Sequence, residues 1–277
     1  MYLSKTQFFA SDRGIVASRH RGIVAYEVSG DGPLVVCTPG MGDLRSTFRF
    51  IAPELVSHGY RVAIIDLRGH GDSSTTFTSH DNPGNAADVT SLVHHLGGPA
   101  VLVGNSMGAA ISVLVAAEHP ELVAGMVLVG PFVRNGKVGA ALKAVMRVMV
   151  APPFVKLTWN SYLPALYMGV QPPDQKQHLA NVRAGMKGRE HAISHTMPTD
   201  HADAEAALPR VHTPVLVVMG DLDPDFASPR DEADWIVERL GGTVLMVPDA
   251  GHYPQAQRPD IVLPAIRVFL ATVAPNA

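Results

Sequence analysis

The sequence predicts an α/β fold: a doubly wound, mostly parallel sheet that carries an inserted helical cap. Short β-branched runs recur between helical patterns, and runs such as Val215–Met219 are apolar throughout, as in parallel strands buried on both faces. Strands that alternate with helices favour right-handed crossovers in one sheet. The expected strands are Ile23–Val28, Leu34–Thr38, Val62–Asp66, Ala100–Val103, Met126–Val129, Val215–Met219 and Thr243–Val247, and the expected helices include Thr47–His58, Ala86–Leu96, Met107–His119 and Pro229–Leu240.

The beginning of the predicted sheet is antiparallel. Ser29-Gly30-Asp31-Gly32-Pro33 lies between the first two expected strands and is typical of a hairpin turn. We therefore expect these two strands to form an antiparallel edge before the parallel part.

The alternation of strands and helices stops between Pro131 and about Leu208. This stretch contains no buried-strand run, and its 9 Lys/Arg against 5 Asp/Glu give it a net charge of +4. We interpret residues 131–208 as a helical cap inserted into a core of residues 1–130 and 209–277.

One helix of this insertion is expected to be amphipathic. Leu142, Val145, Met146 and Met149 recur at helical spacing, which predicts a helix with one apolar face and one solvated face. A membrane surface or an anionic substrate is the alternative explanation for such a basic, amphipathic segment.

Composition excludes several classes of protein. The 277 residues are 47% apolar and 17% charged, against about 25% charged in an average soluble domain, which excludes a disordered or fibrous chain. The net charge of −3 argues against nucleic acid as the main partner. Cys37 lies in an apolar run and is expected to be buried. The sequence shows no signal peptide and no membrane span, so we expect a cytoplasmic protein without stable membrane insertion.

Gly104-Asn105-Ser106-Met107-Gly108 is a Gly-x-Ser-x-Gly pentapeptide between an expected strand and an expected helix. In this setting a sharp turn raises the Ser106 hydroxyl above the sheet as a nucleophile. Glycines at 104 and 108 suit a strained turn and a close strand–helix crossing, where side chains have no room. The alternative is that Ser106 is simply the N-cap of an ordinary helix.

A serine nucleophile needs a general base, and His252 is the candidate. It follows the expected strand Thr243–Val247, at the edge where open α/β sheets place their sites. His191 and His195 have the i,i+4 spacing of metal ligands, but no third ligand is evident, so we expect no metal.

The acid that orients the base is expected in Gly220-Asp221-Leu222-Asp223-Pro224-Asp225, which follows another strand. We choose Asp223 because it clears the strand end before Pro224 stiffens the loop. Asp225 is the second candidate, and Asp221 suits a turn. The order Ser106, Asp223, His252 is that of one known triad arrangement.

Two backbone N–H groups are expected to stabilise negative charge that develops on a substrate oxygen. One belongs to Met107, directly after the nucleophile. The other is assigned to Met41 in the glycine-containing loop 38–43. This loop lacks the residues of a P-loop and the G-x-G-x-x-G spacing, which disfavours a nucleotide role.

Four segments follow one another after expected strands, namely Pro39–Gly42, Asp66–Ser73, Gly104–Gly108 and Gly251-His252. Together they resemble the α/β-hydrolase superfamily over nearly the whole chain. The resemblance implies a cap at Pro131–Leu208 and the same five roles for Ser106, Asp223, His252, Met41 and Met107. Pro39 departs from the many members that carry His before the glycine, which removes a side chain that supports this loop.

The serine at the elbow excludes two branches of the superfamily. Haloalkane dehalogenases and soluble epoxide hydrolases need a carboxylate at the position of Ser106. We therefore expect a cofactor-free serine hydrolase that cleaves a small to medium, largely apolar ester. The alternatives are a carbon–carbon hydrolase of ring-cleavage products, to which the Gly-Asn-Ser-Met-Gly elbow is similar, a lactonase or perhydrolase, and a catalytically silent ligand receptor.

The expected partner is a small molecule, with a homodimer as a further possibility. The Met and aromatic residues of the cap suggest an adaptable apolar wall, with simple packing as the alternative. The candidates for substrate contact are Gly40, Met146, Trp159, Tyr162 and Tyr253.

Overall fold

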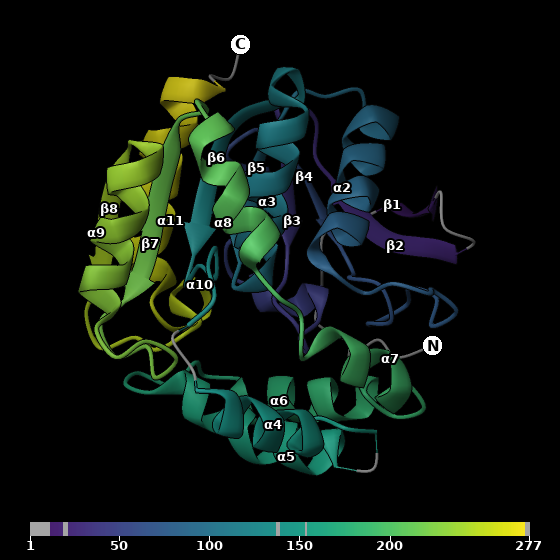
Figure 1. Cartoon of the computed structure of the whole chain (residues 1–277). Helices are drawn as coiled ribbons and strands as arrows, with labels where there is room; N and C mark the ends of the chain where they lie inside the picture. Colours follow the sequence, from purple (N-terminus) through teal and green to yellow (C-terminus); the bar gives the residue numbers. More distant parts are fainter. Residues whose placement is uncertain (1–11, 19–21, 137–138, 153, 275–277) are drawn as a thin grey trace.

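One eight-stranded sheet forms the centre of the computed structural model, which describes residues 12–18, 22–136, 139–152 and 154–274 (Figure 1). Its order is β1-β2-β4-β3-β5-β6-β7-β8. The strands from β4 to β8 along this order are parallel, and β2 pairs antiparallel with both β1 and β4. The doubly wound, mostly parallel sheet is thus confirmed. The strands are β1 (Asp12–Ser18), β2 (Gly22–Ser29), β3 (Leu34–Thr38), β4 (Arg61–Ile65), β5 (Ala100–Asn105), β6 (Val123–Val129), β7 (Val215–Gly220) and β8 (Thr243–Val247).

The first two expected strands correspond to β2 and β3, and the prediction that they pair as a hairpin is wrong. β2 lies between β1 and β4, whereas β3 lies between β4 and β5, so β2 and β3 are not neighbours. The antiparallel edge is real, but its partner strand is β1, which was not predicted. Gly30 and Gly32 do adopt positive φ angles of 79° and 118°, and they pack against the backbone of Gly59 and Tyr60. The glycine-rich segment therefore encoded a tight turn, and a turn alone does not specify which strands pair.

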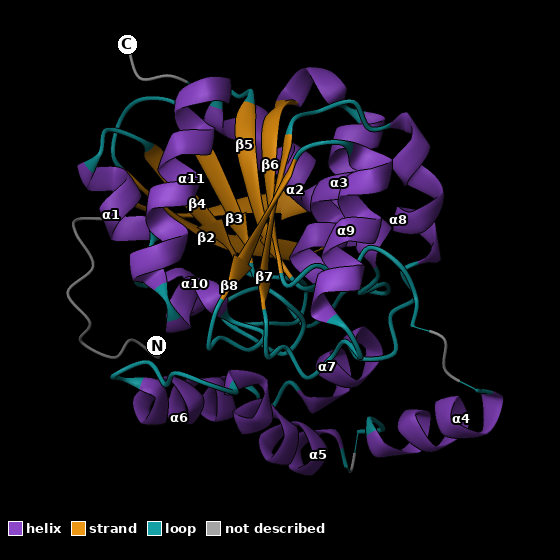
Figure 2. Ribbon diagram, turned by 90° about the vertical axis from the view of Figure 1, so that its left-hand side faces the viewer, coloured by secondary structure: helices purple, strands orange, loops and turns teal. Residues whose placement is uncertain are grey.

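Two hydrophobic clusters sandwich the sheet because successive side chains of a strand point to opposite faces. On β5, Leu102 belongs to the cluster under α2, α3 and α9, while Val101 and Val103 belong to the cluster under α1 and α11. Figure 2 shows these helix groups on opposite sides of the strands. Cys37 lies in the second cluster and is fully buried, as expected.

Helix ends follow local signals. The Asp81 side chain accepts a hydrogen bond from the Gly84 N–H at the start of α2, and Gly97 ends this helix with a φ of 81°. The predicted helix Thr47–His58 is instead split, because Pro53 fits only the first turn of a new helix. The helices are α1 (Ala52–Ser57), α2 (Asn82–Leu96), α3 (Met107–Glu118), α4 (Ala140–Met149), α5 (Val155–Tyr162), α6 (Gln175–Gly185), α7 (Glu190–Thr196), α8 (Ala202–Ala207), α9 (Pro229–Leu240), α10 (Pro254–Gln257) and α11 (Pro259–Val273), with short 3-10 turns η1 (Arg45–Phe48), η2 (Pro120–Leu122), η3 (Leu163–Tyr167) and η4 (Leu208–Arg210).

Helices α4 to α7 form a layer beneath the carboxyl ends of the parallel strands (Figures 1 and 2). α8, although it belongs to the same stretch of sequence, packs against α3 and α2. α4 covers the segment expected to be amphipathic, and the side chains of Val145, Val148 and Met149 are exposed there. Among the described residues, no helix is long and apolar enough to cross a membrane.

Candidate active site

The turn between β5 and α3 places Ser106 at the carboxyl edge of the sheet. Ser106 has φ 56° and ψ −118°, a conformation rare for a residue with a side chain, and its hydroxyl does not cap α3. A Cβ at Gly104 would collide with the Gly108 carbonyl, and one at Gly108 would collide with the Thr38 carbonyl. The glycines are therefore required by close backbone approach, and Ser106 is not an ordinary N-cap.

His252 and Asp223 meet at the same edge. The His252 Nδ1 lies 2.7 Å from Asp223 Oδ2, and both side chains are buried. Asp225 is the more distant carboxylate, with its Oδ2 3.6 Å from the same nitrogen, and its own N–H donates to Asp223 Oδ1 at 3.0 Å. Asp221 is exposed at the end of β7. Of the three competing carboxylates, Asp223 is thus the one that contacts the imidazole directly.

The elbow and the His252 loop are tied together by backbone and side-chain contacts. The Asn105 amide donates to the carbonyls of Val129 and His252, at 3.0 Å and 3.3 Å. The Ser106 N–H donates to the Val129 carbonyl at 2.9 Å. These bonds bring together the nucleophile candidate and the base candidate, which are separated by more than 140 residues in the sequence.

Charge favours the protonated form of His252. Burial lowers its pKa, but the Asp223 carboxylate, helped by Asp225 and Asp43, outweighs burial and raises the pKa to about 9. Asp223 accepts the Nδ1 proton, so this pair fixes the tautomer in which Nε2 is the nitrogen that exchanges a proton.

The loop after β3 lies against the elbow. A Cβ on Gly40 would lie 2.8 Å from Ser106 Cβ and 3.3 Å from its Oγ, so this loop passes directly beside the hydroxyl. Met41 follows in this loop. Met107 is the first residue of α3, where a backbone N–H has no partner inside the helix. The two expected oxyanion donors therefore lie in segments that flank Ser106.

His70 supports this loop, a role that sequence reasoning missed. The Gly42 N–H donates to His70 Nε2 at 2.9 Å, and His70 Nδ1 bonds the Arg68 carbonyl at 2.9 Å. Burial lowers the pKa of His70 to about 4, so its ring is neutral and accepts at Nε2. His70 belongs to the segment Asp66–Ser73, which is one of the four segments that carry the resemblance to the family. Its side chain supports the loop after β3, a role that Pro39 cannot fill.

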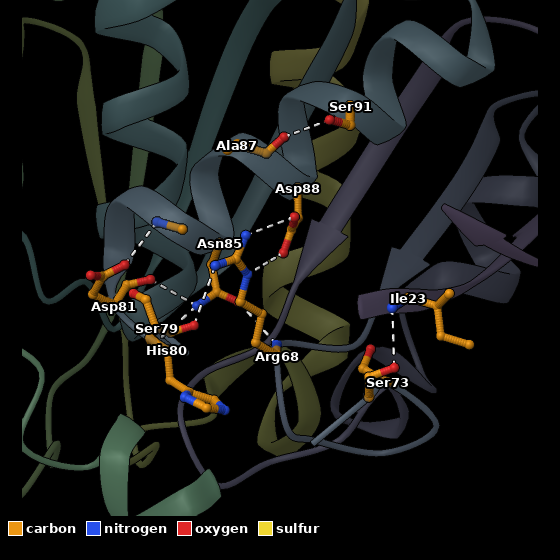
Figure 3. A network of polar contacts seen from close by, with 12 residues as sticks. Ile23, Arg68, Ser73, Ser79, His80, Asp81, Asn85, Ala87, Asp88 and Ser91 are labelled. Carbon is orange, nitrogen blue, oxygen red and sulfur yellow. Dashed lines mark hydrogen bonds and ion pairs between the residues drawn. The ribbon is translucent and has the colours of Figure 1, made fainter. Parts of the chain in front are cut away.

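Arg68 anchors the loop that carries His70 (Figure 3). Its buried guanidinium donates to both carboxylate oxygens of Asp88, at 2.6 Å and 3.0 Å, and to the Ser79 carbonyl. Its backbone N–H donates to the Asn85 side chain at 3.0 Å. A bidentate pair of this kind fixes direction as well as distance, which holds the loop firmly against α2.

Two residues of α5, both proposed for substrate contact, reach loops of the site. Trp159 Nε1 donates to the Gly42 carbonyl at 3.0 Å, and the Tyr162 hydroxyl bonds Asp225 Oδ1. Tyr253 is buried, with its ring stacked on Tyr167 at 4.6 Å and packed edge-on against His252. The side chain of Met146, the remaining candidate, lies outside the described residues.

Two polar contacts join α6 and the turn before it to the site. Asp43, in the loop after β3, lies 3.4 Å from His178 of α6, and both side chains are fully buried. Arg49 binds both oxygens of Asp174 at 2.7 Å. The two partners of each contact are more than 120 residues apart in the sequence, so no local pattern predicts either contact.

One cluster of metal-ligating atoms occurs in the described part of the chain. Asp223, Asp225 and His252 bring three such atoms within 4.8 Å of one another, and they already bond one another and Tyr162. The rings of His191 and His195 lie 4.3 Å apart, and no third ligand joins them among the described residues.

The parallel sheet, the elbow after β5 and the His252–Asp223 pair after β8 and β7 define an α/β protein of the hydrolase type. A model of the alpha/beta hydrolase family matches residues 35–265. The chain belongs to this family and is a hydrolase of the α/β type.

Several known proteins similar to this chain are named as hydrolases or esterases. A 2-(acetamidomethylene)succinate hydrolase of Mesorhizobium japonicum is 29% identical over 251 residues, which cover 87% of this chain and 89% of the relative. A pimeloyl-[acyl-carrier protein] methyl ester esterase of Chromobacterium violaceum is 28% identical over 262 residues, with 90% and 98% covered. The structure of a thermophilic esterase from Thermogutta terrifontis superposes with a TM-score of 0.76 at 25% identity, covering 95% of this chain and 99% of that one.

Proposed function

We propose that the chain is a serine hydrolase that cleaves small to medium, largely apolar carboxylic esters through an acyl-enzyme intermediate. The observation that carries this proposal is the buried His252–Asp223 pair at 2.7 Å, next to the strained elbow that presents Ser106. The similarity to two named esterases supports an ester as the substrate.

In the proposed mechanism, Ser106 Oγ attacks the ester carbonyl carbon while His252 Nε2 takes the hydroxyl proton. Asp223 stabilises the resulting imidazolium. The N–H groups of Met41 and Met107 hold the negative charge on the carbonyl oxygen. When the tetrahedral intermediate collapses, the C–O bond breaks and His252 returns the proton to the leaving alcohol. Water, activated by the same histidine, then releases the acid and regenerates Ser106.

The test is hydrolysis of p-nitrophenyl esters from C2 to C12 by wild type and by Ser106→Ala. We expect turnover that is greatest for short or medium chains, and a loss of about 10⁴-fold or more in the variant. Full turnover by Ser106→Ala would overturn the proposal.

The same assay separates the alternatives. Ser106-dependent turnover of a vinylogous diketone, a lactone or a peracid precursor, without turnover of simple esters, would replace the ester proposal by that chemistry. An amide panel belongs in the assay, because one relative is named as a hydrolase of an acetamidomethylene compound. Ligand binding with no turnover of any of these substrates would favour the silent receptor.

A further inference from the structure

Helix α5 contacts two separate loops of the proposed active site with side chains three residues apart. Trp159 and Tyr162 are neighbours on the helix surface, as residues at i and i+3 are, with ring centroids 6.3 Å apart. Each directs its polar atom at a different loop. The same helix exposes Leu157, whose side chain is 71% accessible.

Trp159 holds the loop after β3 from the cap side. Its indole N–H donates to the Gly42 carbonyl at 3.0 Å, while the Gly42 N–H donates to His70 on the core side. Gly42 has a φ of 71°, and a Cβ there would lie 2.6 Å from Trp159 Cε2. The residue directly after Met41 is therefore fixed on both sides, and one of these contacts comes from the cap.

Tyr162 holds the carboxylate nearest to the acid–base pair. Its hydroxyl donates to Asp225 Oδ1, and the other oxygen of Asp225 lies 3.6 Å from His252 Nδ1. Burial raises the pKa of Asp225, and His252 and the Tyr162 hydroxyl both oppose this rise. A hydroxyl donor therefore helps this carboxylate to keep its negative charge next to the imidazole.

The groups that face His252 can be named from each element packed against it. Asp223 and Asp225 come from the loop after β7, and Asp43 acts on it from the loop after β3. The rings of Phe132 and Tyr253 pack edge-on to the imidazole at 5.8 Å and 5.3 Å. Of these three carboxylates, Asp225 is the one that accepts a hydrogen bond from a side chain of α5, the Tyr162 hydroxyl.

We propose that α5 positions both halves of the catalytic apparatus: Trp159 fixes the oxyanion loop through Gly42, and Tyr162 holds the Asp225 carboxylate against His252. This inference rests on the proposed function and extends it. Both aromatic residues are positioning residues, and docking of the cap on the core completes the site.

Titration of His252 tests the role of Tyr162. Nitrogen-15 NMR of the imidazoles, with His252 assigned by comparison with His252→Asn, measures its pKa without turnover. We expect Asp225→Asn to lower this pKa by about 1 unit, because a nearby negative charge is lost. Tyr162→Phe shifts it in the same direction by less, and adding Tyr162→Phe to Asp225→Asn changes nothing further. The matched control, Leu157→Ala on the same helix, leaves the titration unchanged.

Hydrogen exchange tests the role of Trp159. Loss of the indole donor in Trp159→Phe should make the amides of the segment 40–44 exchange about tenfold faster, which corresponds to one lost hydrogen bond. We expect a lower kcat with an unchanged KM for the preferred ester, because the contact acts on the oxyanion loop and not on the bound substrate. The His252 titration should not move in this variant, and Leu157→Ala should match wild type.

The two proposals can fail separately, because the NMR and exchange measurements do not require turnover. Absence of Ser106-dependent hydrolysis would overturn the proposed function alone. If Tyr162→Phe left the His252 pKa at its wild-type value, or shifted it equally in the Asp225→Asn background, the role of Tyr162 would be wrong. Exchange in Trp159→Phe that equals exchange in Leu157→Ala would overturn the role of Trp159.

Discussion

Ser106 shows how single residues of this site are held in unfavourable conformations by their surroundings. A positive φ costs a residue with a side chain on the order of 1–3 kcal/mol. The turn persists because the Ser106 N–H bonds Val129, and because Gly104 and Gly108 allow the backbone segments to touch. The strained residue is thereby held at the carboxyl edge of the sheet, beside Gly40.

The two carboxylates near His252 differ in their distance from its Nδ1, and we expect their substitutions to differ accordingly. Asp223→Asn should lower kcat by about 10⁴-fold, because an amide no longer holds the imidazole in the required tautomer. Asp225→Asn should stay within about tenfold of wild type, since its carboxylate lies 3.6 Å from Nδ1. Steady-state kinetics on one p-nitrophenyl ester measures both. A larger loss in Asp225→Asn would make Asp225 the triad acid.

The pH dependence of activity follows from His252 as a base. Burial opposes its protonation, but Asp223 raises its pKa to about 9, so the imidazole is mostly protonated at pH 7. A base must be neutral to accept a proton, so kcat/KM should rise with pH through this range and level off above pH 9. The profile is measured from pH 6 to 10 with the Ser106→Ala rate subtracted as background. A rise centred near 6.5 would contradict the expected charge environment.

At the scale of elements, the close crossing of α3 over β3 and β5 sets the position of Ser106, the proposed nucleophile. α3 is buried over most of its length, and its first turn touches the Thr38 carbonyl through Gly108. Small residues at this crossing allow the helix N-terminus to lie directly behind Ser106. The packing of α3 therefore fixes both Ser106 and the Met107 N–H.

Gly108→Ala separates this packing effect from helix propensity. Alanine in a helix is normally more stable than glycine by roughly 0.5–1 kcal/mol. Here its Cβ would collide with the Thr38 carbonyl, so we expect the free energy of unfolding to fall by about 2–3 kcal/mol. Urea denaturation measures the change. Gly139→Ala, whose Cβ would meet nothing within 4 Å, is the control and should stay near wild type. A stabilised Gly108→Ala variant would show that α3 can shift without cost.

At the scale of the whole molecule, the candidate site is assembled from loops at the carboxyl ends of β3, β4, β5, β7 and β8, with helices α4 to α7 below them (Figure 1). Two buried histidines of the described chain are neutral near pH 7. Burial lowers the pKa of His70 and of His201 to about 4 each. Protonation of either histidine would therefore place a charge in a buried position.

These histidines predict a loss of stability in mild acid. Between pH 6.5 and about 4 the unfolded chain binds protons that the folded histidines do not, so the free energy of unfolding should fall by several kcal/mol as the pH drops through this window. Burial raises the pKa of Asp66 to about 6, so protonation of this carboxyl below about pH 6 favours the folded state. This single group offsets only part of the loss caused by the two histidines. Urea midpoints at pH 7, 5.5 and 4.5 measure the slope. His70→Gln should show a shallower slope, and an equal slope would exclude His70 as a source.

Sequence determined the parts of this protein that depend on local order. Periodicity and β-branched runs predicted the parallel strands, because burial on both faces leaves a continuous apolar pattern. The Gly-x-Ser-x-Gly spacing predicted the elbow, because glycines at 104 and 108 report a steric need that is local to one turn. The positions of Ser106, Asp223 and His252 after strands predicted that they meet at one edge, and Asp223 and His252 do lie in contact.

Only the tertiary structure decided which segments pair. The turn at residues 29–33 was visible in the sequence, but β2 pairs with β1 and β4 and not with β3. A turn fixes dihedral angles and leaves strand pairing to long-range packing. The same holds for His70 beneath Gly42, and for Trp159 and Tyr162 on the two loops of the site. These contacts join residues 28 to 117 positions apart. No local pattern predicts these contacts, because they form only when segments that are far apart in the sequence pack together.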